Sequence, residues 1–221
     1  MVLVTKTIKG IIFDLDGVIV STDQYHYRAW KMLADRIGAS FDESVNDRLR
    51  GVSRMASLEI VLEGYRGKPF SKEEKADLAA EKNRYYVELL KQMKPDSVSD
   101  SVRDTLHILR KRGYRLAIGS SSKNTKRILN YTALDHYFDA VSDGTNIAHS
   151  KPDPEVFEKA ALYLKLTSSA CAVVEDAYAG IDAAKAAGML AIGIGPAADY
   201  ARAEISIQQL SDLQLIFDDI I

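Results

Sequence analysis

Short apolar runs recur along this chain, and each one ends abruptly in polar or turn-forming residues. Buried strands of a parallel sheet show this pattern, because both faces of such a sheet are covered. Helical periodicity, with apolar residues three or four positions apart, precedes each of the later runs. The alternation predicts an α/β fold with a Rossmann-like parallel sheet. The runs are Ile8–Phe13, Tyr114–Gly119, Ala170–Val174 and Met189–Ile194.

The alternation stops between about Gln24 and Met93, where we predict consecutive amphipathic helices. The longest candidate helix runs from Lys72 to Leu90. Short polar residues before this segment and a proline after it disfavour a continuing helix at either end. We therefore expect a helical cap domain at 22–94, inserted into a catalytic core made of residues 1–21 and 95–221.

The composition is that of an ordinary globular protein, with 47% hydrophobic and 27% charged residues in a chain of 221. The formal net charge of -2 gives no excess that would favour nucleic acid or an anionic membrane. Lys6 and Lys9 interrupt the apolar N-terminal stretch, which we interpret as a strand and not as a signal peptide. No run approaches the roughly 20 apolar residues of a membrane helix, so we expect a cytoplasmic protein. Cys171 is the only cysteine, and its apolar surroundings predict a buried structural residue.

Polar side chains gather where the predicted strands end, which is where open α/β sheets bind their ligands. The first run ends in FDLDG, where Asp14 and Asp16 lie on one side if the backbone stays extended, and Gly17 permits a turn. Neighbouring carboxylates repel, so they need a shared proton or a cation, and hard oxygen ligands suit Mg²⁺. Glu175 and Asp176 end another strand, and Asp176 can supply a third oxygen. The alternative is that Asp14 and Asp16 only cap a turn or a helix.

Two further strand ends carry groups suited to phosphate. Hydroxyl side chains and backbone N–H groups at the start of a helix can cradle a phosphate, although serines there often serve only as a helix cap. Lys151 lies in HSKPDPEVF, whose prolines predict an extended segment followed by a helix start, and an isolated lysine of this kind is usually solvated. The first group consists of Ser120, Ser121, Ser122, Lys123 and Asn124.

FDLDG, the serines after a strand, Lys151 before a proline and the final acidic pair follow the motif order of the haloacid dehalogenase-like superfamily. The chain resembles this family over nearly its whole length. The resemblance implies that Asp14 is the nucleophile that forms an aspartyl phosphate and that Asp16 is the general acid and base. It also implies that Ser120 and Lys151 hold the transferring phosphoryl group. The implied Mg²⁺ ligands are Asp14, the backbone carbonyl of Asp16, Asp176 and Glu175.

The helical insertion resembles the cap of the β-phosphoglucomutase subgroup of that family. The resemblance rests on YHYRAW, which contains His26, on RGVSR, which ends in Arg54, and on EKNRYY, which contains Lys82. It implies that Arg54 binds the second phosphate of a sugar bisphosphate and that His26 couples cap closure to the placement of Asp16. Surface roles for Arg54 and His26 are the alternatives. Thr22 joins the implied catalytic residues, and the other implied substrate contacts are Gly51, Val52, Ser53, Lys82, Ser121, Ser122, Lys123 and Asn124.

The expected reaction is the interconversion of β-glucose 1-phosphate and glucose 6-phosphate through β-glucose 1,6-bisphosphate, by a monomer whose partners are small sugar phosphates. Two positions depart from the subgroup, namely Ser21, where relatives commonly carry aspartate, and Arg50, where a lysine is usual. One rival function is a sugar-phosphate phosphatase of the same superfamily. The other is a catalytically silent sugar-phosphate binder, which would have no need to keep both Asp14 and Asp16.

Overall fold

The computed structural model describes residues 8–49 and 52–218, and the chain divides into two compact units. The core unit comprises Met1–Ser21 and Lys94–Ile221, and the cap unit comprises Thr22–Met93. Each unit has a hydrophobic cluster of its own. Within the described ranges, no helix combines the length and the apolar character that a membrane span requires.

The core unit is built on a six-stranded sheet, as far as the described residues show, with the order β3-β2-β1-β4-β5-β6. Every neighbouring pair of strands is parallel, which confirms the α/β fold class predicted from the sequence. The first described strand, β1, lies in the middle of the sheet. The chain then builds outward through β2 to β3 and returns to add β4, β5 and β6 on the other side of β1. The strands are β1 (Gly10–Phe13), β2 (Arg115–Gly119), β3 (Ala140–Ser142), β4 (Cys171–Glu175), β5 (Leu190–Ile194) and β6 (Ile205–Ile207).

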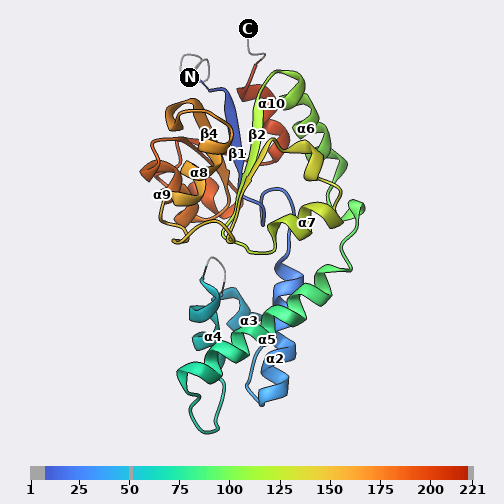
Figure 1. The fold of residues 1–221 in the computed structure, drawn as a ribbon, viewed down its shortest axis with the longest axis vertical. Helices are drawn as coiled ribbons and strands as arrows, with labels where there is room; N and C mark the ends of the chain where they lie inside the picture. Colours follow the sequence, from blue (N-terminus) through green and yellow to red (C-terminus); the bar gives the residue numbers. More distant parts are fainter. Residues whose placement is uncertain (1–7, 50–51, 219–221) are drawn as a thin grey trace. The chain divides into compact units, whose positions relative to one another are not determined.

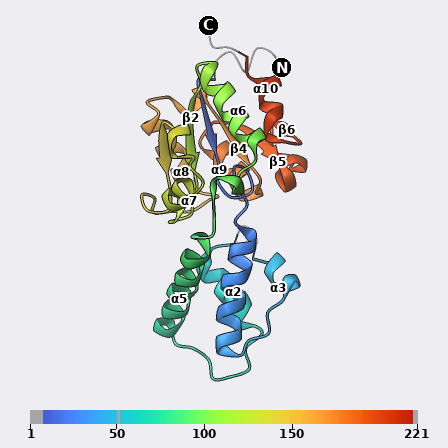
Figure 2. The same cartoon turned by 90° about the vertical axis from the view of Figure 1, so that its right-hand side faces the viewer.

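Helices cover both faces of this sheet (Figures 1 and 2). On one face α8 packs on β1, β2 and β3, while α9 packs on β4 and β5; on the other, α6 packs on β2 and against α10. The α-helices of the core unit are α6 (Asp100–Lys111), α7 (Thr125–Tyr131), α8 (Glu155–Tyr163), α9 (Tyr178–Ala186) and α10 (Leu213–Ile216). Its short 3-10 helices are η1 (Pro95–Ser97), η2 (Asp135–Tyr137), η3 (Ser168–Ala170), η4 (Gly195–Asp199) and η5 (Leu210–Asp212).

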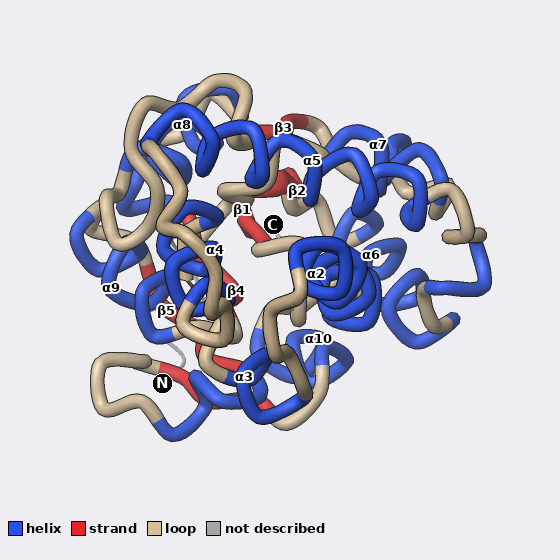
Figure 3. Tube along the Cα trace, turned by 90° about the horizontal axis from the view of Figure 1, so that it is seen from below, coloured by secondary structure: helices blue, strands red, loops and turns tan. Residues whose placement is uncertain are grey.

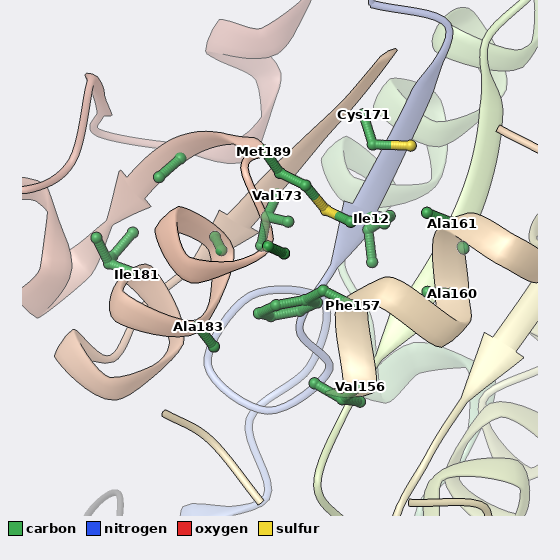
Figure 4. Packing of buried hydrophobic residues seen from close by; sticks show 14 of the residues in the cluster. Ile12, Val156, Phe157, Ala160, Ala161, Cys171, Val173, Ile181, Ala183 and Met189 are labelled. Atoms are coloured by element: carbon green, nitrogen blue, oxygen red, sulfur yellow. The ribbon is translucent and has the colours of Figure 1, made fainter. Parts of the chain in front are cut away.

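A hydrophobic cluster joins the sheet to α8 and α9 (Figure 4). Ile12 and Val173 of neighbouring central strands, Phe157 of α8 and Ile181 of α9 all belong to this cluster, and all four residues are fully buried. Cys171 lies in the same cluster, as the sequence predicted, and burial raises the pKa of its thiol to about 11. Its thiol is therefore a packing group that stays protonated at neutral pH.

The described part of the cap unit, 22–49 and 52–93, contains helices and no strand (Figure 3). Helix α5 has the bounds that the sequence predicted, and it begins with a capping box between Ser71 and Glu74. Helix α2 ends at Gly38, which adopts a left-handed conformation with φ 73°. The cap helices are α2 (Asp23–Ile37), α3 (Glu43–Asp47), α4 (Arg54–Leu62) and α5 (Lys72–Leu90). Their apolar faces meet in a cluster that includes Trp30, Leu33, Leu58, Val61 and Leu78.

Burial predicts which leucines stabilise the core unit. Leu109 of α6 is 0% exposed, whereas Leu162 of α8 is 68% exposed. We expect Leu109→Ala to lower the free energy of unfolding by about 2–5 kcal/mol, because it removes buried apolar contacts and leaves a cavity. Leu162→Ala, the control, should change it by less than about 0.5 kcal/mol. Urea unfolding followed by circular dichroism checks both, and equal losses for the two variants would contradict the assigned packing.

Candidate active site

The carboxyl ends of three adjacent strands bring the predicted core residues together. Asp14 follows β1, Ser120 follows β2, and Glu175 is the last residue of β4, with β1 between the other two strands. The Asp14 backbone N–H donates to the Val174 carbonyl at 3.0 Å, which extends the pairing of β1 and β4 by one step. Asp14 is 8% exposed, Ser120 4% and Glu175 1%. The sheet therefore presents two buried carboxylates and a hydroxyl at one edge, where ligands of such folds bind.

Lys151 connects these carboxylates. Its Nζ donates to Asp14 Oδ1 at 2.5 Å and also to Glu175 Oε1, and it lies 4.7 Å above the ring of Phe157. Burial lowers the pKa of Lys151, but the charges of Asp14 and Glu175 outweigh burial, so the pKa is raised above its usual value. Burial raises the pKa of Glu175 above its usual value, although the Lys151 ammonium opposes the shift. The hydrogen bonds of the Lys151 ammonium to Glu175 and to a second carboxylate favour the charged form of the pair.

Asp176 adds further negative charge to the same edge. Its pKa is raised to about 7, first by burial and then by the charges of Glu175, Asp14 and Asp16. Gly17 turns the chain with φ +85°, and a Cβ at this position would lie 2.0 Å from Asp176 Oδ2. The FDLDG turn and Asp176 therefore lie against each other, and only glycine leaves room for that carboxylate.

The donor set of this edge fits a hard divalent cation. Asp14, Asp16, Glu175 and Asp176 are coupled electrostatically, and Lys151 supplies one positive charge against these carboxylates. Carboxylate and carbonyl oxygens are the ligands that Mg²⁺ prefers. Both oxygens of Glu175 accept hydrogen bonds, one from Lys151 and one from the Ala177 N–H at 3.0 Å. Glu175 therefore orients Lys151, and Asp14, Asp16 and Asp176 are candidates for ligands together with it.

The loop after β2 is held by its own serines. Ser120 Oγ accepts from the Ser122 N–H at 3.2 Å, and Ser122 Oγ accepts from the Asn124 N–H at 3.2 Å. Asn124 is the N-terminal cap residue of α7, and Lys123 is exposed. These contacts stabilise the turn before α7, and the helix cap that the sequence left as an alternative for the serines is Asn124 instead. They do not use the hydroxyl hydrogen of Ser120, so the same side chain can donate to a phosphate oxygen.

His26 and Lys82 form a buried pair in the cap unit. Lys82 is 3% exposed, and its Nζ lies 2.7 Å from His26 Nδ1 and 4.8 Å from the ring centroids of both Trp30 and Tyr86. Burial, and then the charges of Lys82 and Arg54, hold the pKa of His26 well below 6.5. His26 is therefore neutral at neutral pH, and its Nδ1 accepts from the Lys82 ammonium. The ring N–H then lies at Nε2 and can donate to another group.

Arg54 is the first residue of α4, and its Nη2 donates to Asn83 Oδ1 of α5 at 3.0 Å. Ser53 caps this helix by accepting from the Ala56 N–H at 3.4 Å, while Val52 beside it is 36% exposed. Thr22 is the cap residue of α2, and its carbonyl accepts from the Tyr25 and His26 N–H groups. Gly51 and Arg50 lie outside the described residues.

The structure thus places the predicted residues in two groups, one in each unit. The core unit joins Lys151 directly to Asp14 and Glu175, and the charges of these residues act on the nearby Asp176. The cap unit joins His26 to Lys82 and Arg54 to Asn83. Sequence reasoning did not assign a role to Tyr86, whose ring contacts both Lys82 and His26. Its position four residues after Lys82 on one helix is the signal that could have found it. Phe157, whose ring lies under the Lys151 ammonium, was not assigned a role either.

Comparison with known proteins identifies the family. The family model of haloacid dehalogenase-like hydrolases matches residues 8–188. The chain is 40% identical over 208 residues to a β-phosphoglucomutase of Bacillus subtilis, which covers 94% of this chain and 92% of the relative. It is 29% identical to a phosphorylated carbohydrates phosphatase of Thermotoga maritima, over 82% of each chain.

A solved structure gives the same result. The crystal structure of a β-phosphoglucomutase from Clostridium difficile superposes with a TM-score of 0.84 at 36% identity, over 95% of both chains. The match therefore extends over the core motifs and the helical insertion alike. This chain belongs to the haloacid dehalogenase-like hydrolase family.

Proposed function

We propose that the chain is a phosphomutase that interconverts β-glucose 1-phosphate and glucose 6-phosphate through β-glucose 1,6-bisphosphate. The observation that carries the proposal is the contact of Lys151 with Asp14 and Glu175 at the carboxyl edge of the sheet. The 40% identity to the β-phosphoglucomutase of Bacillus subtilis supports the choice of substrate. The monomeric state and the cytoplasmic location stay predictions from the sequence.

In the first half-reaction, a carboxylate oxygen of Asp14 attacks the phosphorus of the bisphosphate. The new oxygen–phosphorus bond forms as the bond to the sugar oxygen breaks, and Asp16 gives its proton to that oxygen. In the second half-reaction, a hydroxyl of the sugar monophosphate attacks the aspartyl phosphate and returns a proton to Asp16. Each cycle therefore moves a phosphoryl group and leaves Asp14 and Asp16 as they began.

The attack brings an anionic carboxylate toward an anionic phosphoryl group, so positive charge must stabilise the transition state. Lys151 supplies an ammonium that is already fixed against Asp14. Ser120 donates its hydroxyl to a phosphoryl oxygen, with Ser121, Ser122, Lys123 and Asn124 as further contacts. Asp14, the Asp16 carbonyl and Asp176 would hold Mg²⁺, which when bound neutralises charge on the transferring group.

The cap unit supplies recognition of the second phosphate in this proposal. Arg54 has a guanidinium that can meet a phosphate through two parallel hydrogen bonds, and Asn83 holds it at the start of α4. Val52, Ser53 and Gly51 precede it, and Lys82 adds a buried positive charge. His26 donates from Nε2 when substrate is bound, which links recognition of the sugar to the placement of Asp16.

A phosphatase of the same family is the second candidate, favoured by the 29% identity to the Thermotoga maritima phosphatase. Hydrolysis and mutase activity share the aspartyl phosphate and differ only in whether water or a sugar hydroxyl accepts the phosphoryl group. The silent binder is disfavoured, because Lys151 contacts Asp14 and the charges of Asp14, Asp16 and Glu175 act together on Asp176.

Phosphorus NMR separates these functions. With Mg²⁺, β-glucose 1-phosphate and a trace of the bisphosphate, we expect glucose 6-phosphate to appear without an equal amount of inorganic phosphate. Inorganic phosphate as the main product would establish the phosphatase, and an unchanged spectrum would support the silent binder.

The nucleophile assignment predicts that Asp14→Asn lowers turnover by at least about 10³-fold, because the amide is a much poorer nucleophile than the carboxylate. Intact-mass spectrometry of the quenched wild-type reaction should show an added phosphoryl group that is missing from this variant. Asp104→Asn, an exposed position on α6, is the isosteric control and should keep wild-type turnover. A phosphorylated Asp14→Asn enzyme would rule out Asp14 as the nucleophile.

The contact between His26 and Lys82 in the cap unit predicts a change in the pKa of His26. Because the Lys82 charge lowers the pKa of His26, we expect Lys82→Met to raise it, although burial still keeps it below 6.5. In the folded wild-type protein, the pKa of His26 lies below its value in the unfolded chain. The unfolded chain therefore binds a proton more readily at this ring, and the free energy of unfolding falls as the pH drops below 6.5. Titration of the His26 ring by proton NMR measures the shift. Exposed Lys91→Met is the control, and an unchanged pKa in Lys82→Met would contradict the pairing.

A further inference from the structure

Lys151 is carried by a loop between β3, which ends at Ser142, and α8, which begins at Glu155. Ala148, His149 and Ser150, just before Lys151, are exposed residues. Such a segment loses conformational freedom when it is held in one arrangement. The Lys151 ammonium contacts Asp14 at 2.5 Å, so the loop that carries it must be held in one arrangement. This requires contacts that restrain the loop.

Glu155 supplies this restraint. Its Oε2 accepts from the backbone N–H groups of Ala148 and His149, both at 2.8 Å, and its Oε1 accepts from Lys159 Nζ at 2.6 Å. Lys159 lies one turn further along α8 and also donates to the carbonyl of Asn146. One carboxylate and one ammonium of the same helix thus hold three backbone groups of the loop.

Asn146, at the start of the restrained segment, is attached to the end of the sheet. Asn146 Oδ1 accepts from Ser142 Oγ at 3.2 Å and from the Asp143 N–H at 3.1 Å. The segment 146–149 is therefore held between β3 and α8. The same helix also provides Phe157, which is fully buried and lies 4.7 Å below the Lys151 ammonium.

The geometry assigns Glu155 as a positioning residue for phosphoryl transfer, which acts with Lys159 to fix the loop that presents Lys151 to Asp14 and Glu175. This inference rests on the proposed function, in which Lys151 stabilises the transferring phosphoryl group. Glu155 does not act on the reacting atoms itself. It sets the position of the group that does.

The same loop has the composition of a metal site, because ligand atoms of His149, Asp153 and Glu155 lie within 4.8 Å of one another. The charges instead favour a hydrogen-bonded clamp, by which we mean Glu155 and Lys159 holding the backbone of residues 146–149. Both Glu155 oxygens already accept hydrogen bonds, and the Lys159 ammonium beside them would repel a cation. The Lys159 hydrogen bond and then the His149 N–H lower the pKa of Glu155 to about 2, so the carboxylate stays ionised throughout the neutral range.

The test compares Glu155→Gln with Glu158→Gln, an exposed glutamate of the same helix. We expect Glu155→Gln to lower kcat about 10- to 100-fold with little change in KM, because a small displacement of a catalytic group costs this much. The Glu158→Gln control should keep wild-type kcat. Lys159→Met should lower kcat in the same direction, and it carries the test if Glu155→Gln proves unfolded by circular dichroism.

A double-mutant cycle with Lys151→Met separates positioning from a general structural role. If Glu155 acts through Lys151, then Glu155→Gln should have no further effect on kcat once the ammonium is gone. An additive loss in the Lys151→Met background, or wild-type kcat in both Glu155→Gln and Lys159→Met, would overturn the inference.

Amide hydrogen exchange makes the result independent of the reaction. Glu155→Gln should speed exchange at Ala148 and His149, the two N–H groups that the carboxylate accepts from. If the wild-type enzyme showed no turnover, the proposed function would fail. Amide exchange would still show whether Glu155 holds the loop. Unchanged exchange at these two amides would overturn the clamp whatever the activity.

Discussion

The buried ammonium of Lys151 is the charge on which the core site depends. It lies between Asp14 and Glu175, and the nearby Asp176 has a raised pKa because negative charges and burial act on it together. Removing one partner from a buried ion pair commonly costs about 3–5 kcal/mol, because the remaining charge is left without compensation. In the proposed reaction, the same ammonium opposes the repulsion between Asp14 and the phosphoryl group. Stability of the site and its chemistry therefore rest on one contact.

Each unit of this protein buries a lysine against aromatic rings, but the partners differ. Lys151 lies over Phe157 and meets two carboxylates, whereas Lys82 lies over Trp30 and Tyr86 and meets the neutral ring of His26. A positive charge beside a neutral imidazole suits the recognition of an anion. A positive charge between carboxylates suits a site where an anion is transferred. The two environments agree with a reaction whose intermediate carries two phosphates.

Much of the fold could be predicted from the sequence, because buried parallel strands and long amphipathic helices have strong local patterns. The central strands and the helix Lys72–Leu90 are examples, and the parallel sheet confirms the fold class. The edge strands β3 (Ala140–Ser142) and β6 (Ile205–Ile207) were not predicted. Each is three residues long and partly exposed, so it lacks the continuous apolar run of a central strand.

The sequence by itself determined the chemistry available at the site, because residue types and their order at strand ends name the carboxylates, the hydroxyls and the lysine. Only the tertiary structure decided how these groups are paired. That Lys151 meets both Asp14 and Glu175, that Lys82 meets His26, and that Glu155 holds the loop of Lys151 follow from strand order and loop packing. Such contacts join residues far apart in the chain, and no local pattern encodes them, because they form only when the sheet and the helices have assembled.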